Sequence, residues 1–200
     1  MSILLGDDKP AVHFKEKWYR LDLSFDTVLL VHRLYEDECL DNEDKVNQAL
    51  KLLVKSRFKL WLLGAYDCAK LLEEITRTHI APKRRRKTSN CQKLMDFTYD
   101  ADYIYASFRQ AYGIDLVNEC GRLSWHKFID LLDGLPDKTK IKEVMRIRAM
   151  EVPTPTKTNR KEIQSIMELK SYYALPVKGG GGQEGLNLLF ETLEKGAKRI

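Results

Sequence analysis

One stretch of twenty residues carries the signals of a complete helix, including both of its ends. Residues 97–116 read FTYDADYIYASFRQAYGIDL. Asp100 stands where an N-cap belongs, and Ile104 and Phe108 follow at the spacing of one helical face. Gly113 then supplies a left-handed stop. Because the acids and aromatics stand where a helix needs them, we expect a capped amphipathic helix here.

Asp100 and Asp102, at the start of this stretch, could instead serve chemistry. Two carboxylates that share general acid and base catalysis need a nucleophile or a metal beside them, and the sequence offers neither. The four cysteines and four histidines are scattered singly, without the close spacing of a metal or redox site. We therefore predict capping for both aspartates, reduced and buried cysteines, and a protein that is not an enzyme. We expect no catalytic residue, no metal site and no cofactor.

The same order of caps and apolar stripes recurs along the chain. It predicts helices in six further segments, namely 24–35, 42–54, 58–79, 125–134, 140–150 and 159–175. The segment 58–79 is either one helix broken near Gly64 or two packed helices. Its apolar face includes Leu62. In the fourth, Trp125 falls in the apolar stripe, so we expect it in the core.

A short β-hairpin is expected before the first helix. The segments AVHF and WYRLDL alternate apolar with polar side chains and flank the polar sequence KEK, which suits a turn. In this arrangement we expect Val12, Phe14, Trp18 and Leu21 to point toward the core.

Together these elements predict a mainly α protein built around a compact multi-helix domain. The domain spans residues 1–176 and contains a basic loop at 82–90. A Gly-rich linker at 177–183 and an amphipathic helix at 184–200 follow it. The longest apolar stretch, around LWLLGA, is far shorter than the roughly 20 residues that span a bilayer, so we expect no contact with a membrane.

The net charge of +5 is concentrated in the basic loop. The loop holds five consecutive cations, Lys83, Arg84, Arg85, Arg86 and Lys87, and without them the chain is neutral. Such a run can bind phosphates with a strong dependence on salt. No interleaved aromatic and no helix-turn-helix pattern accompanies it, so a solvated loop is favoured and nucleic-acid binding is the alternative.

Two other segments are candidate partner-binding sites. Arg146 and Arg148 are expected to face solvent or a partner from the helix at 140–150. The C-terminal helix carries an apolar stripe at helical spacing, formed by Leu186, Leu189, Phe190 and Leu193. The amphipathic part of this segment is only about ten residues long, and isolated helices below roughly 12–15 residues are unstable in water. We therefore expect it to fold against a groove, either on a partner or on its own domain.

Three ordered runs of the sequence resemble a known family. They are DFTYDADYIYASFRQAYGIDL, LSWHKFIDLLDGLPDKTKIKEVMRIRAMEV and MELKSYYAL. The family is a helical protein encoded in the tail modules of siphophages and prophages of Gram-positive bacteria, next to the tape-measure gene. It is regarded as a tail assembly chaperone. The resemblance covers about residues 10–176 and is strongest over 96–150, while the basic loop and the Gly-rich end depart from the family pattern.

This resemblance implies a specific role without catalysis. A tail assembly chaperone binds the tape-measure protein before the tail tube forms and is displaced as tube subunits polymerise. The major tail (tube) protein is a further candidate partner from the resemblance, and self-association of the chain is a separate expectation. It also implies a location in the host cytoplasm and absence from the mature virion. The alternative function is that of a phage accessory protein that binds nucleic acid through residues 83–87.

Removal of residues 179–200 should leave the thermal midpoint within a few degrees, because few core contacts are lost. The same truncation should weaken binding to the tape-measure protein or self-association. Thermal denaturation and co-purification of the two chains measure these effects. A truncated protein that melts much earlier and still binds would show that the C-terminal segment is a structural element.

Overall fold

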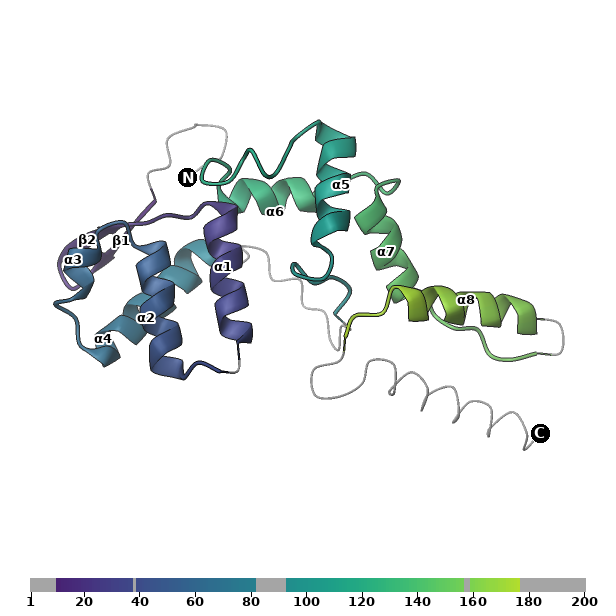
Figure 1. Ribbon diagram of the computed structural model, residues 1–200, viewed down its shortest axis with the longest axis horizontal. Helices are drawn as coiled ribbons and strands as arrows, with labels where there is room; N and C mark the ends of the chain where they lie inside the picture. Colours follow the sequence, from purple (N-terminus) through teal and green to yellow (C-terminus); the bar gives the residue numbers. More distant parts are fainter. Residues whose placement is uncertain (1–9, 38, 82–92, 157–158, 177–200) are drawn as a thin grey trace. The chain divides into compact units, whose positions relative to one another are not determined.

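The computed structural model describes residues 10–37, 39–81, 93–156 and 159–176, and they form a mainly α-helical protein with one hairpin (Figure 1). This confirms the predicted fold class. The elements in chain order are β1 (Ala11–Phe14), β2 (Lys17–Arg20), α1 (Phe25–Glu36), α2 (Asn42–Leu53), α3 (Arg57–Leu60), α4 (Ala65–Ile75), the π-helical turn η2 (Thr76–Ile80), α5 (Ala101–Tyr112), α6 (Trp125–Asp133), α7 (Lys140–Ala149) and α8 (Arg160–Tyr172).

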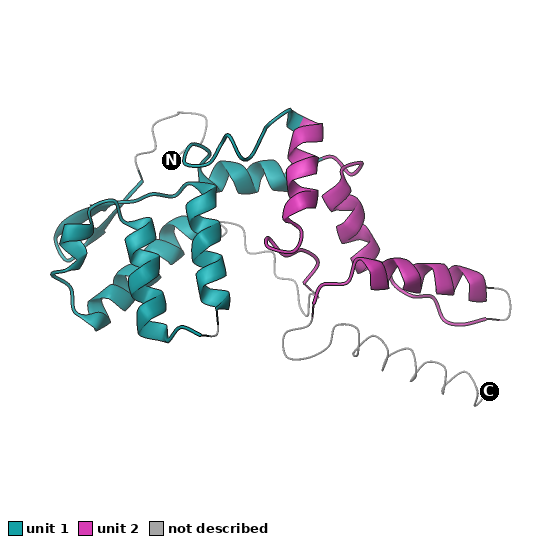
Figure 2. Cartoon of the chain, in the orientation of Figure 1, with its two compact units in different colours: residues 1–88, 112–135 teal, residues 89–111, 136–200 magenta. Residues whose placement is uncertain are grey.

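The chain divides into two compact units (Figure 2). Unit 1 combines residues 1–88 with 112–135, and unit 2 combines residues 89–111 with 136–200. The sequence predicts a single helical domain over residues 1–176, and the two units lie within that range as far as the structure describes them. The predicted linker at 177–183 and helix at 184–200 lie outside the described residues.

The hairpin forms as predicted, but with a different register. Its turn consists of Lys15 and Glu16, both with positive φ values of 46° and 60°, and Tyr19 consequently pairs with Val12. Because side chains alternate along a strand, the shift of one residue buries Tyr19 with Val12 and turns Trp18 outward. The prediction that Trp18 points into the core is therefore wrong.

The core of unit 1 forms between α1, α2, α4 and α6. α1 packs against α2 and α6, and α2 packs against α4. The rings of Phe25 and Phe128 stack with centroids 4.9 Å apart, and Trp125 donates from Nε1 to the carbonyl of Ile80 at 3.2 Å. The predicted helix at 58–79 is broken at Gly64, which is the N-cap of α4. The apolar stripe of α4 is buried as expected.

In unit 2 the main polar contact is a buried ion pair between the residue before α5 and the last turn of α7. The guanidinium of Arg148 donates to both carboxylate oxygens of Asp100, at 2.6 and 2.8 Å. The side chains are only 7% and 1% exposed. Arg148 also donates to the carbonyls of Leu94 and Tyr173, so one side chain connects the segment before α5 with the end of α8.

This arrangement corrects two predictions. Arg148 does not face solvent, whereas Arg146, two residues before it, is exposed. Asp100 does precede the first residue of α5, but its carboxylate accepts from Arg148 and from the backbone N–H of Asp96 at 2.9 Å. Asp100 is therefore the buried counter-ion of an arginine, and its role exceeds that of a cap.

The turn before α5 is closed by another acid, Asp96. Its carboxylate accepts from the backbone N–H groups of Thr98 and Tyr99 at 2.8 and 3.0 Å, and from the side chain of Lys93. Burial acts to raise the pKa of Asp96, but these hydrogen bonds outweigh it and lower that pKa below its usual value. The carboxylate is thus held in its charged form where it organises the turn.

Ser107 connects α5 to α7. This buried hydroxyl donates to the carbonyl of Tyr103 at 2.6 Å and accepts from the backbone N–H of Ile141 at 3.0 Å. The second bond satisfies an N–H group in the first turn of α7, which has no partner within its own helix. A small polar residue on the inner face of α5 therefore fixes where α7 begins to pack.

Asp100→Ala should destabilise the protein by about 3–5 kcal/mol, because it leaves the guanidinium of Arg148 buried without its counter-ion. Urea denaturation measures this loss. Asp102→Ala is the matched control, since Asp102 is an exposed acid in the first turn of α5 and should cost about 0.3–1 kcal/mol.

The double variant Asp100→Leu with Arg148→Met should recover part of the loss, because no charge then remains buried. If Asp100→Ala and Asp102→Ala cost the same small amount, the ion pair does not stabilise unit 2.

Candidate partner-binding surface

Unit 1 exposes a group of large apolar side chains around α3. Five residues of the hairpin, of α3 and the turn that follows it, and of the first turn of α4 are each at least 60% exposed, namely Trp18, Phe58, Trp61, Leu62 and Tyr66. We call these five residues the aromatic patch. Single exposed apolar residues are normal, but a group of this kind is typical of protein interaction sites.

The local sequence explains why these side chains stay in solvent. α3 has only four residues and none of them is buried. Phe58, Trp61 and Leu62 are spaced i, i+3 and i+4, so they project from the same side of this short turn. The chain then reverses at Gly64 to start α4, whose own buried residues begin only at Cys68. The prediction that Leu62 belongs to a buried stripe is therefore wrong.

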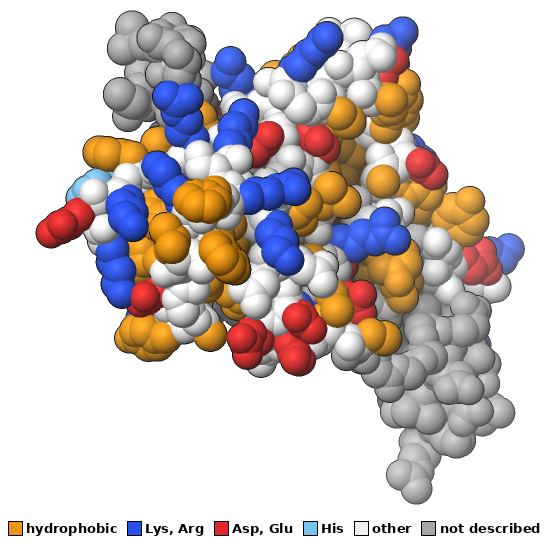
Figure 3. Space-filling view, turned by 60° about the vertical axis from the view of Figure 1, so that its left-hand side comes forward, with side chains coloured by type: hydrophobic (Ala, Val, Ile, Leu, Met, Phe, Trp, Pro, Cys, Tyr) orange, Lys and Arg blue, Asp and Glu red, His pale blue; other side chains and the backbone are white. Residues whose placement is uncertain are grey.

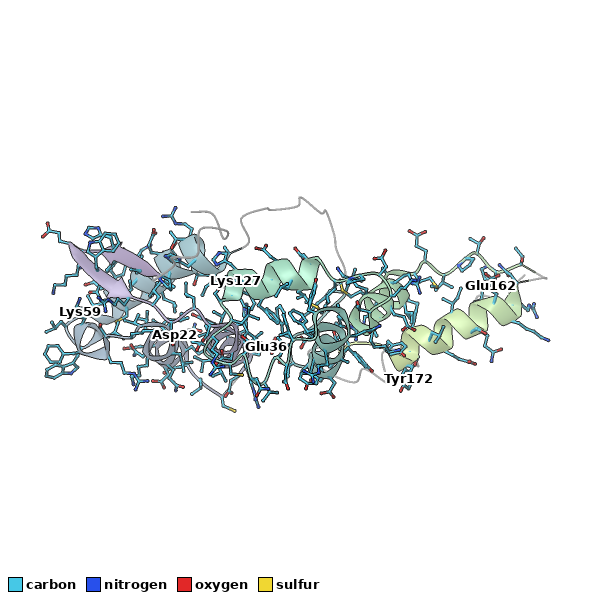
Figure 4. The ribbon with its side chains drawn as sticks, turned by 90° about the horizontal axis from the view of Figure 1, so that it is seen from above. Asp22, Glu36, Lys59, Lys127, Glu162 and Tyr172 are labelled. Carbon is cyan, nitrogen blue, oxygen red and sulfur yellow. The ribbon has the colours of Figure 1, made fainter. Side chains whose placement is uncertain are left out.

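Specific contacts hold α3 beside the hairpin. Lys59 donates from Nζ to the carbonyl of Trp18 at 2.9 Å, and the same ammonium lies 5.9 Å from the centre of the Tyr19 ring. The backbone N–H of Lys55 donates to the carbonyl of Arg20 at 2.9 Å. Figure 4 shows Lys59 beside the ribbon of α3. The strand and the helix that carry the patch are thus tied together.

The hairpin turn is also tied to α4. Lys15 and Asp67 form an ion pair at 2.6 Å between the turn and the first turn of the helix. Tyr19, next to Trp18 in the strand, is fully buried, and its hydroxyl has no hydrogen-bond partner among the described residues. Burial raises the pKa of Tyr19 above its usual value, and the nearby Cys68 and Asp67 raise it further. Tyr19 therefore acts as a neutral core residue beneath the strand.

Cations border the aromatic patch. The two segments 15–20 and 55–66 contain six of them, Lys15, Lys17, Arg20, Lys55, Arg57 and Lys59, and Glu16 is the only acid there. We call these six residues the basic rim. Five of them are exposed and Lys59 is half-buried. Figure 3 shows hydrophobic side chains with Lys and Arg side chains between and around them on the face in view.

Acids gather elsewhere in unit 1, where α1 connects to α2. Exposed carboxylates follow one another in this connection, at Glu36, Asp37, Asp41, Glu43 and Asp44. Asp41 accepts from the backbone N–H of Asp44 at 2.7 Å and so caps α2, as its position predicts. The charges of unit 1 are therefore segregated by element, with cations on the hairpin and α3 and acids between α1 and α2.

A shallow depression of about 360 Å³ lies between β1 and α4. Its charged lining is paired internally, since Lys70 contacts Glu73 at 2.9 Å and Arg77 contacts Glu74 at 2.7 Å. These i, i+3 pairs on α4 and η2 are typical of a solvated helix surface. These paired side chains are not available to a ligand, so we assign no ligand site to the depression.

The residues predicted as sites differ in their exposure. Arg146 is exposed, so it stays a candidate, whereas Arg148 is buried and cannot face a partner. The basic loop at 82–90, with its cations at 83–87, lies outside the described residues. The same holds for the predicted C-terminal stripe, Leu186, Leu189, Phe190 and Leu193.

Catalytic and metal-binding residues are not assigned in the described part of the chain. No group of three or more His, Cys, Asp or Glu side chains suited to a metal occurs there. Cys68 is buried, but Cys39 and Cys120 are exposed, so the prediction of buried cysteines is wrong for these two. Among the described helices, none is long and apolar enough to cross a membrane.

A helical fold with an exposed aromatic patch is typical of a protein-interaction module. The family described as Bacteriophage Gp15 protein matches residues 5–175. Because this match covers most of the sequence, the chain belongs to that bacteriophage protein family. No curated protein and no solved structure gives a significant match. The resemblance to a phage protein is thus confirmed at the level of the family.

Trp61→Ala should change the free energy of unfolding by at most about 0.5 kcal/mol, because the side chain is 83% exposed. Trp125→Ala should cost about 3–5 kcal/mol, because this tryptophan is 5% exposed and packs on Phe128. Denaturant unfolding of the two variants gives the comparison. A large loss for Trp61→Ala would show that the patch is part of the core.

Proposed function

We propose that this protein is a tail assembly chaperone that holds the tape-measure protein through the aromatic patch before the tail tube forms. The observation that carries the proposal is the patch itself. Membership of a bacteriophage family supports the setting, and the resemblance to a protein encoded beside the tape-measure gene supports the client.

The physical properties of the patch suit this role. A long helical client exposes apolar stripes until the tube surrounds it, and those stripes would otherwise aggregate. Tryptophan, tyrosine and phenylalanine supply large contact areas at interfaces and dominate their binding energy. A shallow group of such side chains can accept the apolar face of a helix without requiring one sequence. The client can then be displaced when tube subunits bind it more extensively.

The proposal also places the protein in the host cytoplasm during assembly and outside the mature virion. The tail tube protein is a second candidate partner, because displacement requires it to meet the complex. Self-association and nucleic-acid binding through residues 83–87 are separate alternatives. Each of them predicts a different effect when the aromatic patch is changed.

Co-expression with the tape-measure protein tests the proposal. The wild-type chain should keep the tape-measure protein soluble and co-purify with it. Phe58→Ser with Trp61→Ser should abolish both effects while the thermal midpoint stays within a few degrees, because neither side chain is buried.

The matched control is Tyr99→Ser with Tyr172→Ser, which removes two exposed aromatics of unit 2, the second of them at the end of α8 (Figure 4). This variant should retain the tape-measure protein. If the tape-measure protein is equally soluble alone and never co-purifies, the chaperone function is wrong. If the patch variant retains it as well as the control does, the aromatic patch is not the binding surface.

A further inference from the structure

The aromatic patch and the basic rim together define the chemistry of a partner. We infer that they bind an amphipathic helix whose apolar stripe is flanked by acidic side chains. The identity of this helix as a tape-measure segment rests on the proposed function, whereas its chemistry rests on the charges around the patch.

One segment of the surface has no charge. Residues 60–66 read LWLLGAY and contain no acid and no base, and Trp61, Leu62 and Tyr66 are exposed within them. An uncharged apolar strip of this kind excludes water only against another apolar surface. The matching partner surface is therefore the apolar stripe of a helix, which runs about 5.4 Å per turn and presents one residue or two at each turn.

Only some cations of the basic rim form ion pairs with described residues. Lys15 is paired with Asp67 at 2.6 Å, and Lys55 lies 3.8 Å from Asp22. By contrast, the structure gives Lys17, Arg20 and Arg57 no ion pair with any described residue, and all three are exposed. A partner with acids beside its apolar stripe can therefore pair with these cations. A partner with basic flanks would meet charges of the same sign.

The distribution of the cations favours a helix over a nucleic acid. Surfaces that stack single-stranded bases combine their aromatic rings with cations that track the phosphates along the strand. Here residues 60–66 lack any cation, although two of the exposed rings lie in that segment. The cations precede it, in the hairpin and in residues 55–59. Charges at such a rim set orientation and partner choice more than affinity.

Three synthetic helical peptides of equal length test the inference against the full-length protein by fluorescence anisotropy. The first has an apolar stripe with Glu flanks, the second has the same stripe with Lys flanks, and the third has Glu flanks with the stripe replaced by Ser. The wild-type chain should bind the first about tenfold more tightly than the second, and the third should not bind.

Charge reversal on the protein should reverse this preference. Lys17→Glu with Arg57→Glu should bind the Lys-flanked peptide more tightly than the Glu-flanked one. Arg122→Glu with Lys127→Glu makes the same change in charge on exposed residues of unit 1 outside the patch, and Figure 4 shows Lys127 on α6. This control should keep the wild-type preference. The fold of each variant is checked by its thermal midpoint.

Equal binding of the two flanked peptides to the wild-type chain would overturn the inference. Tighter binding of a single-stranded oligonucleotide than of the Glu-flanked peptide would assign the surface to nucleic acid and would also overturn it. If the peptides show the expected preference and the tape-measure protein never co-purifies, the proposed function fails while the partner chemistry stands. If the tape-measure protein binds through the patch and the peptides bind equally, the proposed function stands while the inferred partner chemistry fails.

Discussion

The ion pair between Arg148 and Asp100 is the constraint on which the described part of unit 2 depends. A buried guanidinium is tolerated only where carboxylate and carbonyl oxygens surround it, and Arg148 has two carboxylate oxygens and two carbonyls. These partners come from the segment before α5, which supplies both Leu94 and Asp100, and from the residue after α8. The requirement to satisfy one charge therefore fixes two separate parts of the chain around the end of α7.

Unit 1 is stabilised by an apolar core instead of a buried ion pair, and it exposes the aromatic patch. Its core is apolar, and the register of the hairpin decides which aromatic side chains enter it. Tyr19 is buried beside Val12, and Trp18 is left in solvent as a result. A hairpin with the opposite register would bury Trp18 and expose Tyr19. The position of the two-residue turn thus contributes directly to the aromatic patch.

Sequence patterns predict the helices well because amphipathic segments such as α2 and α6 repeat the same apolar spacing over successive turns. They failed where a single residue decides the outcome. The turn at Lys15 and Glu16 contains no Gly or Asn to mark its positive φ values, so the register could not be derived. An arginine is expected to be exposed from sequence alone. Arg148 is buried instead, and its burial depends on Asp100, 48 residues away in the sequence. The patch was missed because LWLLGA has the composition of a core.

The two units also differ in how freely their polar and apolar residues can change. Arg148 and Asp100 constrain each other, since loss of either leaves a buried charge, so the pair can change only together. Exposed residues such as Phe58 and Trp61 carry little of the folding free energy, and their replacement acts on binding first. Under the proposed function, the surface around α3 can therefore vary to fit a client helix without disturbing the fold. Because these side chains contribute little to folding, substitutions in the aromatic patch test partner binding without changing the stability of the protein.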